Sequence, residues 1–334
     1  MSQDRILLAH GDGGQLMADL IEHVFISRFG RGEPPGDDAA QLSTAGRLAF
    51  TTDAFVVDPI FFPGGDIGRL AICGTENDLA TAGARPLAIS ASFIIEEGLA
   101  IADLERVADS MARTADEAAV RVVTGDTKVV PRGKVDKLYI STSGVGEIAD
   151  GVSISGANVQ VGDVVIITGP IGDHGLAVLS QREGFRFDSE IVSDCAPLAG
   201  MVQALLRAAP ATHSLRDPTR GGLATALNEI ARQSQVEIEI VEADVPVRPS
   251  VAAACELLGL DPLYAANEGK MAVFISPDQA QRALQALSEH KYGRDATMIG
   301  RATRRCPGRV LLKTALGTHR ILDRHVGEQM PRIC

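Results

Sequence analysis

The sequence has no excess of positive charge and no long apolar run. Its 32 Lys and Arg residues are outnumbered by 43 Asp and Glu residues, so the formal net charge is −11. Nucleic-acid backbones require clustered basic side chains, and this balance argues against a DNA- or RNA-binding protein. No segment approaches the roughly 18 apolar residues of a membrane span, and the start lacks the features of a secretory signal. We therefore expect a cytoplasmic protein with no nucleic-acid or membrane partner.

Two common kinds of site are also missing. The five cysteines form an odd set without a CxxC pair, which is unlike a disulfide framework or a zinc ribbon. The phosphate-binding pattern GxxxxGK[ST] is absent, because Gly269-Lys270 is followed by Met271. Residues 144–149 formally fit GxGxxA, but an Asp-Gly pair follows where a helix should begin. We interpret this segment as the end of a strand.

The distribution of apolar residues predicts two mixed α/β domains (α+β), because 334 residues exceed what one core usually organises. Strands are expected at 48–57, 86–95, 120–130, 137–148, 164–168, 236–242, 271–276, 310–313 and 319–322. Helices are expected at 103–119, 173–183, 196–208, 221–233 and 278–290. Asp103 is the expected N-cap of the first of these helices. The glycine-rich stretch near 155 indicates domains at 1–154 and 155–323. Residues 324–334 have no periodicity and are expected to form a mobile tail.

Short acidic motifs are the most informative feature of the chain. They are GDDAA at 36–40, TTD at 51–53, ND at 77–78, GDTK at 125–128 and DPTRGG at 217–222. Carboxylates at strand ends and in loops can converge on a hard cation such as Mg²⁺, and ATP brings its own Mg²⁺ to an acidic site. A single Asp beside Gly or Thr more often forms a turn or a cap. Five such motifs together favour a magnesium–nucleotide site.

Three further features have both a chemical and a structural interpretation. Gly221 and Gly222 directly precede an apolar helical stripe, so their amides would lie at a helix N-terminus that favours phosphate, or would form an ordinary cap. Glu268, beside a glycine, is a general base, a metal ligand or a loop residue. His213, four residues before Asp217, is a possible acid or base, although a single His is more often structural.

The last residue, Cys334, differs from the other cysteines. It is expected to be exposed, and Arg332 would favour its thiolate while the α-carboxylate opposes it. Prenylation requires a cysteine four residues from the end and is therefore excluded. At about 3.3 Å per residue, the tail could reach roughly 30 Å. The residues themselves indicate a carrier thiol or an incidental exposed thiol.

Taken together, these motifs resemble those of one family. GDDAA, TTD, NDLATAGA, GDTKV and DPTRGG are shared by the superfamily of aminoimidazole ribonucleotide synthetase, selenophosphate synthetase and thiamine-phosphate kinase, and the closing PRIC at 331–334 is the signature of the HypE hydrogenase maturation factors. The resemblance covers essentially the whole chain. It implies the two-domain synthetase-like fold, a homodimer formed through the sheet of the first domain, and a cleft for ATP and Mg²⁺.

The resemblance also implies roles for individual residues. The implied metal ligands are Asp37, Asp38, Asp78, Asp126 and Asp217, and the implied cofactor contacts are Asp53, Asn77, Gly125, Thr127, Lys128, Gly221 and Gly222. Glu76 is an additional carboxylate without an assigned role.

The implied chemistry takes place on Cys334. A carbamoyltransferase, HypF, would place a carbamoyl group on its sulfur, and ATP would phosphorylate the carbamoyl oxygen. Loss of phosphate would leave a thiocyanate, whose cyano group passes to iron on a HypC–HypD scaffold for [NiFe] hydrogenase. Glu268 or His213 would deprotonate the amide nitrogen. The rival hypotheses are ATP-dependent phosphorylation of a free metabolite and a non-catalytic assembly module with a docking tail.

Overall fold

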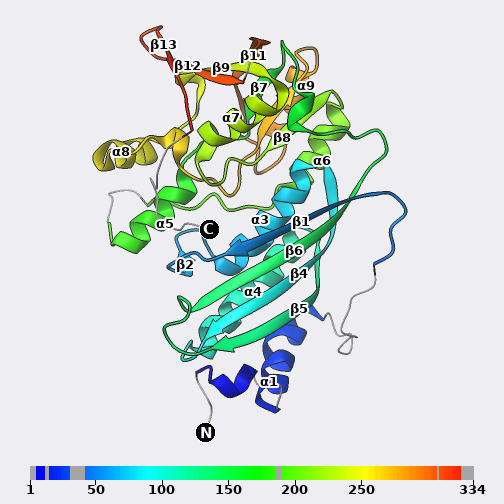
Figure 1. The fold of residues 1–334 in the computed structure, drawn as a ribbon, viewed down its shortest axis with the longest axis vertical. Coiled ribbons are helices and arrows are strands. Elements are labelled where there is room, and N and C mark those ends of the chain that lie inside the picture. Colours follow the sequence, from blue (N-terminus) through cyan, green and yellow to red (C-terminus); the bar gives the residue numbers. More distant parts are fainter. Residues whose placement is uncertain (1–4, 12–14, 31–41, 186–189, 307, 325–334) are drawn as a thin grey trace.

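The computed structural model describes residues 5–11, 15–30, 42–185, 190–306 and 308–324. Two sheets, each covered by helices, lie one above the other along the long axis of the molecule (Figure 1). The GDDAA motif, with Asp37 and Asp38, and the tail that ends in Cys334 fall outside the described residues. The predictions made for them stay predictions.

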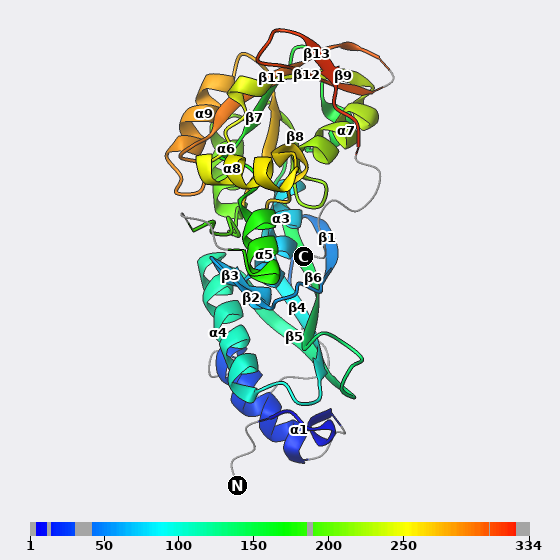
Figure 2. The same cartoon turned by 90° about the vertical axis from the view of Figure 1, so that its left-hand side faces the viewer.

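Four long strands form the sheet of the N-terminal half. Their spatial order is β1 (Arg47–Phe55), β6 (Leu138–Ile148), β4 (Ala84–Glu96) and β5 (Arg121–Val130). Only β4 and β5 are parallel, and α4 (Ile101–Glu117) connects them. Helix α4 lies with α3 (Ile67–Thr81) on one face of this sheet (Figure 2). A short hairpin of β2 (Phe61–Phe62) and β3 (Gly65–Asp66) precedes α3, and α1 (Gln15–Leu20), a π-helical turn (Ile21–Ile26) and α2 (Ser27–Phe29) precede the sheet.

The face of this sheet that is turned away from α3 and α4 carries exposed apolar side chains. Residues two apart on a strand share a face, so Asp53 faces α3 whereas Phe50 faces away and is 70% exposed. Leu48 on β1 and Ile94 on β4 are exposed as well. The strand register places Asp126 and Lys128 of β5 on this same face.

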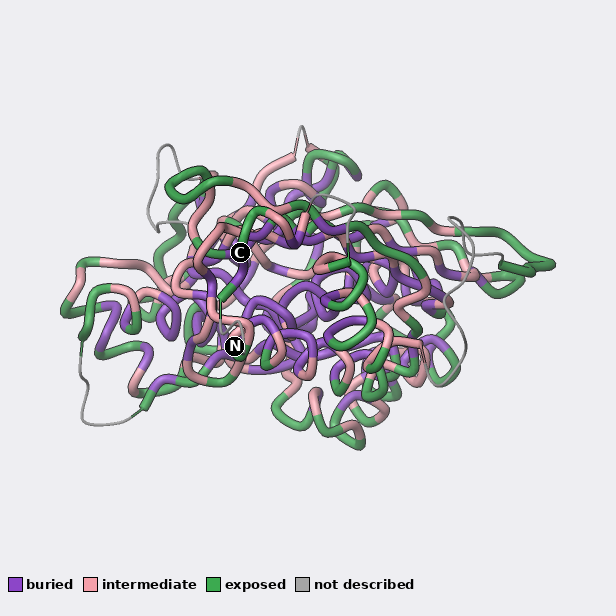
Figure 3. Tube along the Cα trace, turned by 90° about the horizontal axis from the view of Figure 1, so that it is seen from below, coloured by how far each residue is buried: buried purple, intermediate pink, exposed green. Residues whose placement is uncertain are grey.

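Seven strands form the sheet of the C-terminal half. Their order is β13 (His319–Ile321), β12 (Arg309–Lys313), β9 (Val236–Val241), β11 (Thr297–Arg305), β7 (Val164–Ile167), β10 (Ala272–Ile275) and β8 (Thr212–Arg216). Helices α6 (Ala199–Ala208) and α9 (Ala280–Ser288) pack on one face, and α7 (Gly222–Ser234) packs on the other. Each face of the sheet has its own apolar core. Helices α5 (Asp173–Glu183) and α8 (Pro249–Leu258) lie towards the N-terminal half (Figure 2). Clusters of buried apolar residues fill both halves, and buried positions gather in the interior when the molecule is seen end-on (Figure 3).

Helix α3 joins the two halves. The carboxylate of Glu76 is buried and accepts the backbone N–H groups of Leu198 (3.0 Å) and Ala199 (2.7 Å) at the start of α6. These two donors have no partner within α6, because the first amides of a helix lack an internal acceptor. Burial raises the pKa of Glu76 to about 8, although both amides lower it. Glu76, whose role the sequence left open, therefore connects the two halves.

Most of the predicted elements are present, and two predictions are corrected. The strands expected at 48–57, 86–95, 120–130 and 137–148 match β1, β4, β5 and β6, and residues 144–148 do belong to a strand. Helix α4 begins at Ile101 after Ala100, so Asp103 lies in its first turn and is not the N-cap. Asn77-Asp78, expected at a strand end or in a loop, lies inside α3, whereas Gly125–Lys128 lies in β5, in agreement with the strand expected at 120–130. Within the described residues, no helix is both long and apolar enough to cross a membrane.

Candidate active site

Four carboxylates from separate segments converge where the two halves meet. Asp53 lies in β1 and Asp78 in α3, whereas Asp217 directly follows β8 and Glu268 precedes β10. The charge of Asp78 acts on both Asp53 and Asp217, and Asp53 and Asp217 both act on Glu268. The fold therefore brings together four residues that the sequence motifs had singled out. We call these four residues the carboxylate cluster.

Helix α3 and strand β1 exchange two hydrogen bonds at this cluster. Thr51 Oγ1 donates to Asp78 Oδ2 (2.7 Å), and Thr75 Oγ1 donates to Asp53 Oδ2 (3.3 Å). The pairing is possible because residues two apart share a strand face and residues three apart share a helix face. The TTD and ND motifs thus supply three of the four residues of this crossed arrangement, and Thr75, one turn before Asp78, supplies the fourth.

Burial and repulsion raise the pKa values of three acids of the cluster, Asp53, Asp217 and Glu268. Burial, followed by the charge of Asp78, raises the pKa of Asp53 to about 6. The same two causes, in the same order, raise the pKa of Asp217 to about 7. Burial is also the main cause that raises the pKa of Glu268 well above its usual value. A divalent cation would relieve this repulsion, and oxygen-only donors suit Mg²⁺.

The cluster does not form a complete metal site on its own. Over the part of the chain that the structure describes, no three His, Cys, Asp or Glu side chains form a set that could hold a metal ion. The donors present are hard oxygens, so they fit part of a magnesium coordination sphere whose other ligands come from a nucleotide, water or other residues.

The loop that carries Glu268 is held by a buried acid. Asp194 accepts the backbone N–H groups of Glu268 (3.1 Å) and Gly269 (3.2 Å), and it also accepts a hydrogen bond from Lys270 Nζ (3.0 Å). Although burial opposes it, the Lys270 ammonium holds the pKa of Asp194 below its ordinary value. A Cβ at Gly269 would lie 1.8 Å from the Asp194 carbonyl oxygen, so only glycine fits. Asp194 therefore fixes the direction of the Glu268 backbone.

Asn77 supports the same loop from α3. Its Nδ2 donates to the carbonyl oxygens of Ala196 (3.1 Å) and Glu268 (3.3 Å), and its Oδ1 accepts the N–H of Leu198 (2.8 Å). The side chain is 2% exposed. Asn77 is predicted to contact a cofactor, but in this structure both ends of its side-chain amide bind the protein backbone. It acts here as a positioning residue.

The two glycines before α7 serve different purposes. Gly221 is the N-cap residue of α7 with φ +76°, and no side-chain hydrogen bond caps the start of the helix. The N–H of Gly222 is already used, because it donates to Thr219 O (2.9 Å). A Cβ at Gly222 would lie 2.6 Å from the carbonyl oxygens of Leu263 and Ala265, so Gly222 allows close packing.

The GDTK segment does not reach the cluster within one chain. It lies on β5, three strand spacings or roughly 14 Å from β1. Asp126 is exposed and pairs with Lys128 Nζ (2.9 Å) on the open face of the sheet, whereas Thr127 is buried on the other face. A Cβ at Gly125 would lie 2.2 Å from Ala91 O, so Gly125 allows β4 and β5 to approach each other.

His213 lies away from the cluster. Its Nδ1 contacts Asp163 Oδ2 at 2.8 Å. Thr212, the residue before His213 in β8, pairs with Ile275, the last residue of β10. Glu268 precedes Ala272, the first residue of β10. Four strand residues span roughly 13 Å. The structure therefore does not bring His213 and Glu268 together.

Sequence patterns gave no indication of Asp194. It lies in an irregular segment without a motif, and its partner loop is more than 70 residues further along the chain. Thr75 was missed for a different reason: α3 is buried on nearly every side and shows no amphipathic stripe.

Comparisons with known proteins agree with this architecture. Residues 36–148 match the N-terminal domain, and residues 160–313 the C-terminal domain, of AIR synthase related proteins. The chain is 50% identical over 341 residues to the carbamoyl dehydratase HypE of Rhodobacter capsulatus, covering 100% of this chain and 99% of the relative. The chain belongs to the carbamoyl dehydratase HypE family.

Solved structures of the family have the same fold. A crystal structure of the hydrogenase maturation protein HypE in complex with ATP is 48% identical to this chain and superimposes with a TM-score of 0.93, over 98% of this chain and 99% of that one. A HypE chain in a HypE–HypF complex is 47% identical with a TM-score of 0.82, over 93% and 100% of the two chains. The expected synthetase-like, two-domain α+β fold is thus confirmed.

The anchoring of the Glu268 loop gives a testable expectation. Asp194→Asn keeps the shape of the side chain but removes the charge that pairs with the buried Lys270. We expect the loop to lose its fixed position, because removing one partner leaves a buried charge unpaired. The reaction rate at saturating substrate should fall about 10- to 100-fold, as with other supporting residues, with a changed pH profile. Asp194→Glu, which keeps the charge, should recover part of the rate, and equal rates for all three proteins would contradict the role.

Proposed function

We propose that the chain is an ATP-dependent carbamoyl dehydratase that acts on a carbamoyl group bound to the sulfur of Cys334. The product is a thiocyanate on Cys334, which supplies cyanide ligands for the iron of [NiFe] hydrogenase. Family membership supports the reaction. The main structural support is the position of Glu268, the buried member of the carboxylate cluster, on a loop held by Asp194 and Asn77.

In the proposed reaction the carbamoyl oxygen attacks the γ-phosphate of ATP, and the amide nitrogen loses a proton. The nitrogen then loses its second proton as the C–O bond to phosphate breaks, leaving a C≡N triple bond, ADP and phosphate. Phosphate is needed because hydroxide is a far poorer leaving group. Glu268 is our candidate for the base that receives a proton from nitrogen, which requires a hydrogen bond between them.

Asp53, Asp78 and Asp217 are the described residues that would hold Mg²⁺. The ion would neutralise the phosphate charges of ATP and relieve the repulsion among the carboxylates. Asp37 and Asp38 are proposed as further ligands on the basis of the GDDAA motif. Gly221, at the uncapped start of α7, is proposed to face phosphate.

We propose that the protein forms a homodimer through the open face of its first sheet. Phe50, Leu48 and Ile94 leave an apolar surface there, and such surfaces mark interaction sites when they are contiguous. Asp126 and Lys128 share this face, so a dimer would give them a route to the nucleotide of the partner. This would reconcile their predicted role with their distance from Asp53.

Phe50→Glu is expected to convert the dimer to a monomer. By symmetry the change places two charges in the interface, and each lost phenyl ring removes about 2 kcal/mol of apolar burial. The fold should be unaffected because Phe50 is 70% exposed in the single chain. Light scattering coupled to size-exclusion chromatography measures the mass. Leu316→Glu, at a 92% exposed turn, is the control and should stay dimeric. A dimeric Phe50→Glu protein would exclude this interface.

The proposed partners are a HypF carbamoyltransferase and a HypC–HypD iron scaffold, and the proposed compartment is the cytoplasm. The relative crystallised with HypF supports the first partner. Relatives at about half identity bear the name carbamoyl dehydratase, which disfavours the metabolite kinase and the non-catalytic module.

Intact-mass measurement tests the proposed function. After incubation with a HypF carbamoyl-donor system, the chain should gain one carbamoyl group. It should then lose one water, only when ATP and Mg²⁺ are present. A carbamoyl group that persists under those conditions would overturn the dehydratase. ATP hydrolysis that consumes an added metabolite without any change in mass would favour the kinase.

A further inference from the structure

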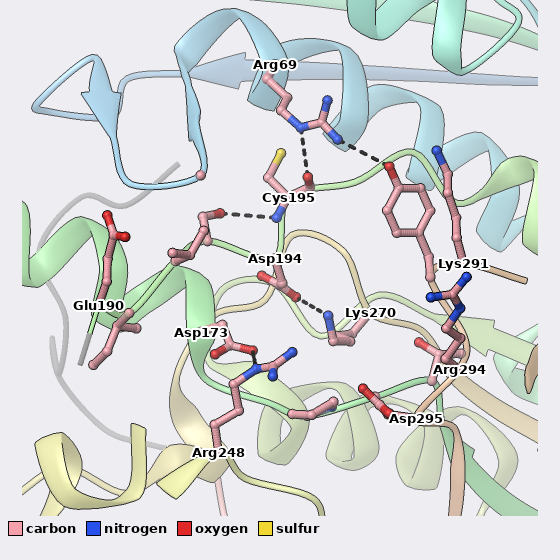
Figure 4. Close-up of a pocket in the computed structure, with 18 of the residues that line it drawn as sticks. Arg69, Asp173, Glu190, Asp194, Cys195, Arg248, Lys270, Lys291, Arg294 and Asp295 are labelled. Atoms are coloured by element: carbon pink, nitrogen blue, oxygen red, sulfur yellow. Dashed lines mark hydrogen bonds and ion pairs between the residues drawn. The ribbon is translucent and has the colours of Figure 1, made fainter. Parts of the chain in front are cut away.

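A pocket of about 930 Å³ lies between the two halves of the molecule (Figure 4). Its walls come from α3 and α4 on one side, and from the β7–α5 loop, the start of α8 and residues 291–295 on the other. Asp194 and Cys195 line it, whereas none of the four residues of the carboxylate cluster does. The pocket is therefore distinct from the proposed reaction site, and its size is that of a small-molecule site.

Contacts that cross between the halves hold the pocket in shape. Arg69 of α3 donates through Nε to the Cys195 carbonyl oxygen (2.9 Å) and through its guanidinium to Glu117 of α4 (3.1 Å). Lys291 and Tyr292 from the C-terminal half bind the same Glu117 carboxylate. Although burial opposes them, hydrogen bonds from Lys291, Tyr292 and Arg69 lower the pKa of Glu117 to about 2. One carboxylate thus ties three groups together.

Within this network, cations outnumber acids. Two pairs are closed, Lys270 with Asp194 (3.0 Å) and Arg248 with Asp173 (3.1 Å). Glu117, in contrast, is shared between Arg69 and Lys291. One positive charge is therefore left over on that wall of the pocket.

Two more guanidinium groups line the pocket from opposite halves. Arg113 comes from α4 and Arg294 from the segment after α9, both are exposed, and neither forms an ion pair with a described acid. The remaining acids of the lining are Asp295, next to Arg294, and Glu190, which Figure 4 draws on the other side of the pocket from Lys291 and Arg294. With all groups ionised, six basic residues face five acidic ones, in a chain whose net charge is −11.

We propose that this pocket binds a small polyanion, a molecule with at least two phosphate or carboxylate groups. Guanidinium groups bind both kinds of oxyanion in a forked geometry, and Arg113 and Arg294 offer one such group from each half. Ser250 also lines the pocket and adds a hydroxyl donor. A ligand that contacts both arginines would bridge the halves and stabilise their relative arrangement.

Calorimetric titration of the full-length protein tests this site. The nucleotide site is first saturated with a non-hydrolysable ATP analogue and Mg²⁺, and pyrophosphate or citrate is then added at constant ionic strength. We expect saturable binding of at least one probe without release of the analogue. The probe that binds more tightly identifies phosphate or carboxylate as the preferred group.

Variants locate the bound probe. Arg113→Ala combined with Arg294→Ala should weaken its binding about tenfold or more, the effect expected from lost charge-assisted hydrogen bonds, and should leave analogue binding unchanged. Arg282→Ala, an exposed arginine on α9 outside the pocket, is the matched control and should bind the probe normally. The proposal is overturned if neither probe binds, if the probe displaces the analogue, or if the double variant matches the control.

Discussion

Replacing Cys334 by alanine is expected to abolish the gain of a carbamoyl group completely. In the proposed reaction the thiolate sulfur forms the bond to the carbamoyl carbon, and a methyl group has no lone pair with which to form it. The same protein should therefore show no ATP-dependent loss of water in intact-mass measurement, and it should supply no cyanide to an iron acceptor. ATP binding should be unaffected, because the carboxylate cluster does not include this residue.

The control for Cys334→Ala is another cysteine with some exposure. Cys306 is partly exposed, whereas Cys73, Cys195 and Cys255 are buried. Cys306→Ala should accept one carbamoyl group and lose one water as the unchanged protein does. If Cys334→Ala is still carbamoylated and dehydrated, the carrier role of the last residue is wrong, whichever enzyme supplies the group.

Glu268→Gln is expected to accept the carbamoyl group and then stall before dehydration. Glutamine has nearly the same shape but cannot accept the amide proton, and loss of a general base costs about 10²- to 10⁴-fold in rate. The local fold should persist, because Asp194 and Asn77 bind the backbone at position 268 and not its side chain. Single-turnover mass measurement would separate an undiminished carbamoylation from a slowed loss of water.

Two matched variants decide whether the effect belongs to Glu268. Glu256→Gln on α8 changes an exposed glutamate and should dehydrate normally. His213→Gln should also dehydrate at close to the normal rate, because His213 contacts Asp163 at the far end of β8. A stalled His213→Gln protein with an active Glu268→Gln protein would reverse the choice between the two candidate bases.

Several residues of the site were accessible from the sequence because their chemistry is local. An acid beside Gly, Thr or Asn is visible in the chain without knowing the fold, and Asp53, Asp78 and Glu268 were singled out in this way, whereas Asp217 was singled out by its DPTRGG motif. Strands β1 and β10 were visible too, since alternation and β-branched residues mark them, but β8, which directly precedes Asp217, was not predicted. Helix α3 was not visible, because a helix buried on nearly every side has no polar face to produce a periodic pattern.

The supporting residues could not be found in the same way. Asp194 acts on a loop more than 70 residues away, and Glu76 acts on amides of α6 more than 120 residues away. Each is an ordinary acid in the sequence and becomes specific only through the donors that it meets. Lys128 shows the converse case, since its motif suggests the nucleotide while the strand register places it on the opposite face of the sheet from Asp53.

The sequence by itself determined the types of donor, the family to which they belong, and the terminal thiol on which the proposed chemistry depends. Only the tertiary structure decided which of those donors meet, because convergence depends on strand order, helix packing and burial. It placed four carboxylates in one partly buried cluster, directed Asn77 and Asp194 to the Glu268 backbone, and kept His213 apart. The physical reason is that a motif specifies chemistry over a few residues, whereas a pKa and a hydrogen-bond partner are set by groups far away in the chain.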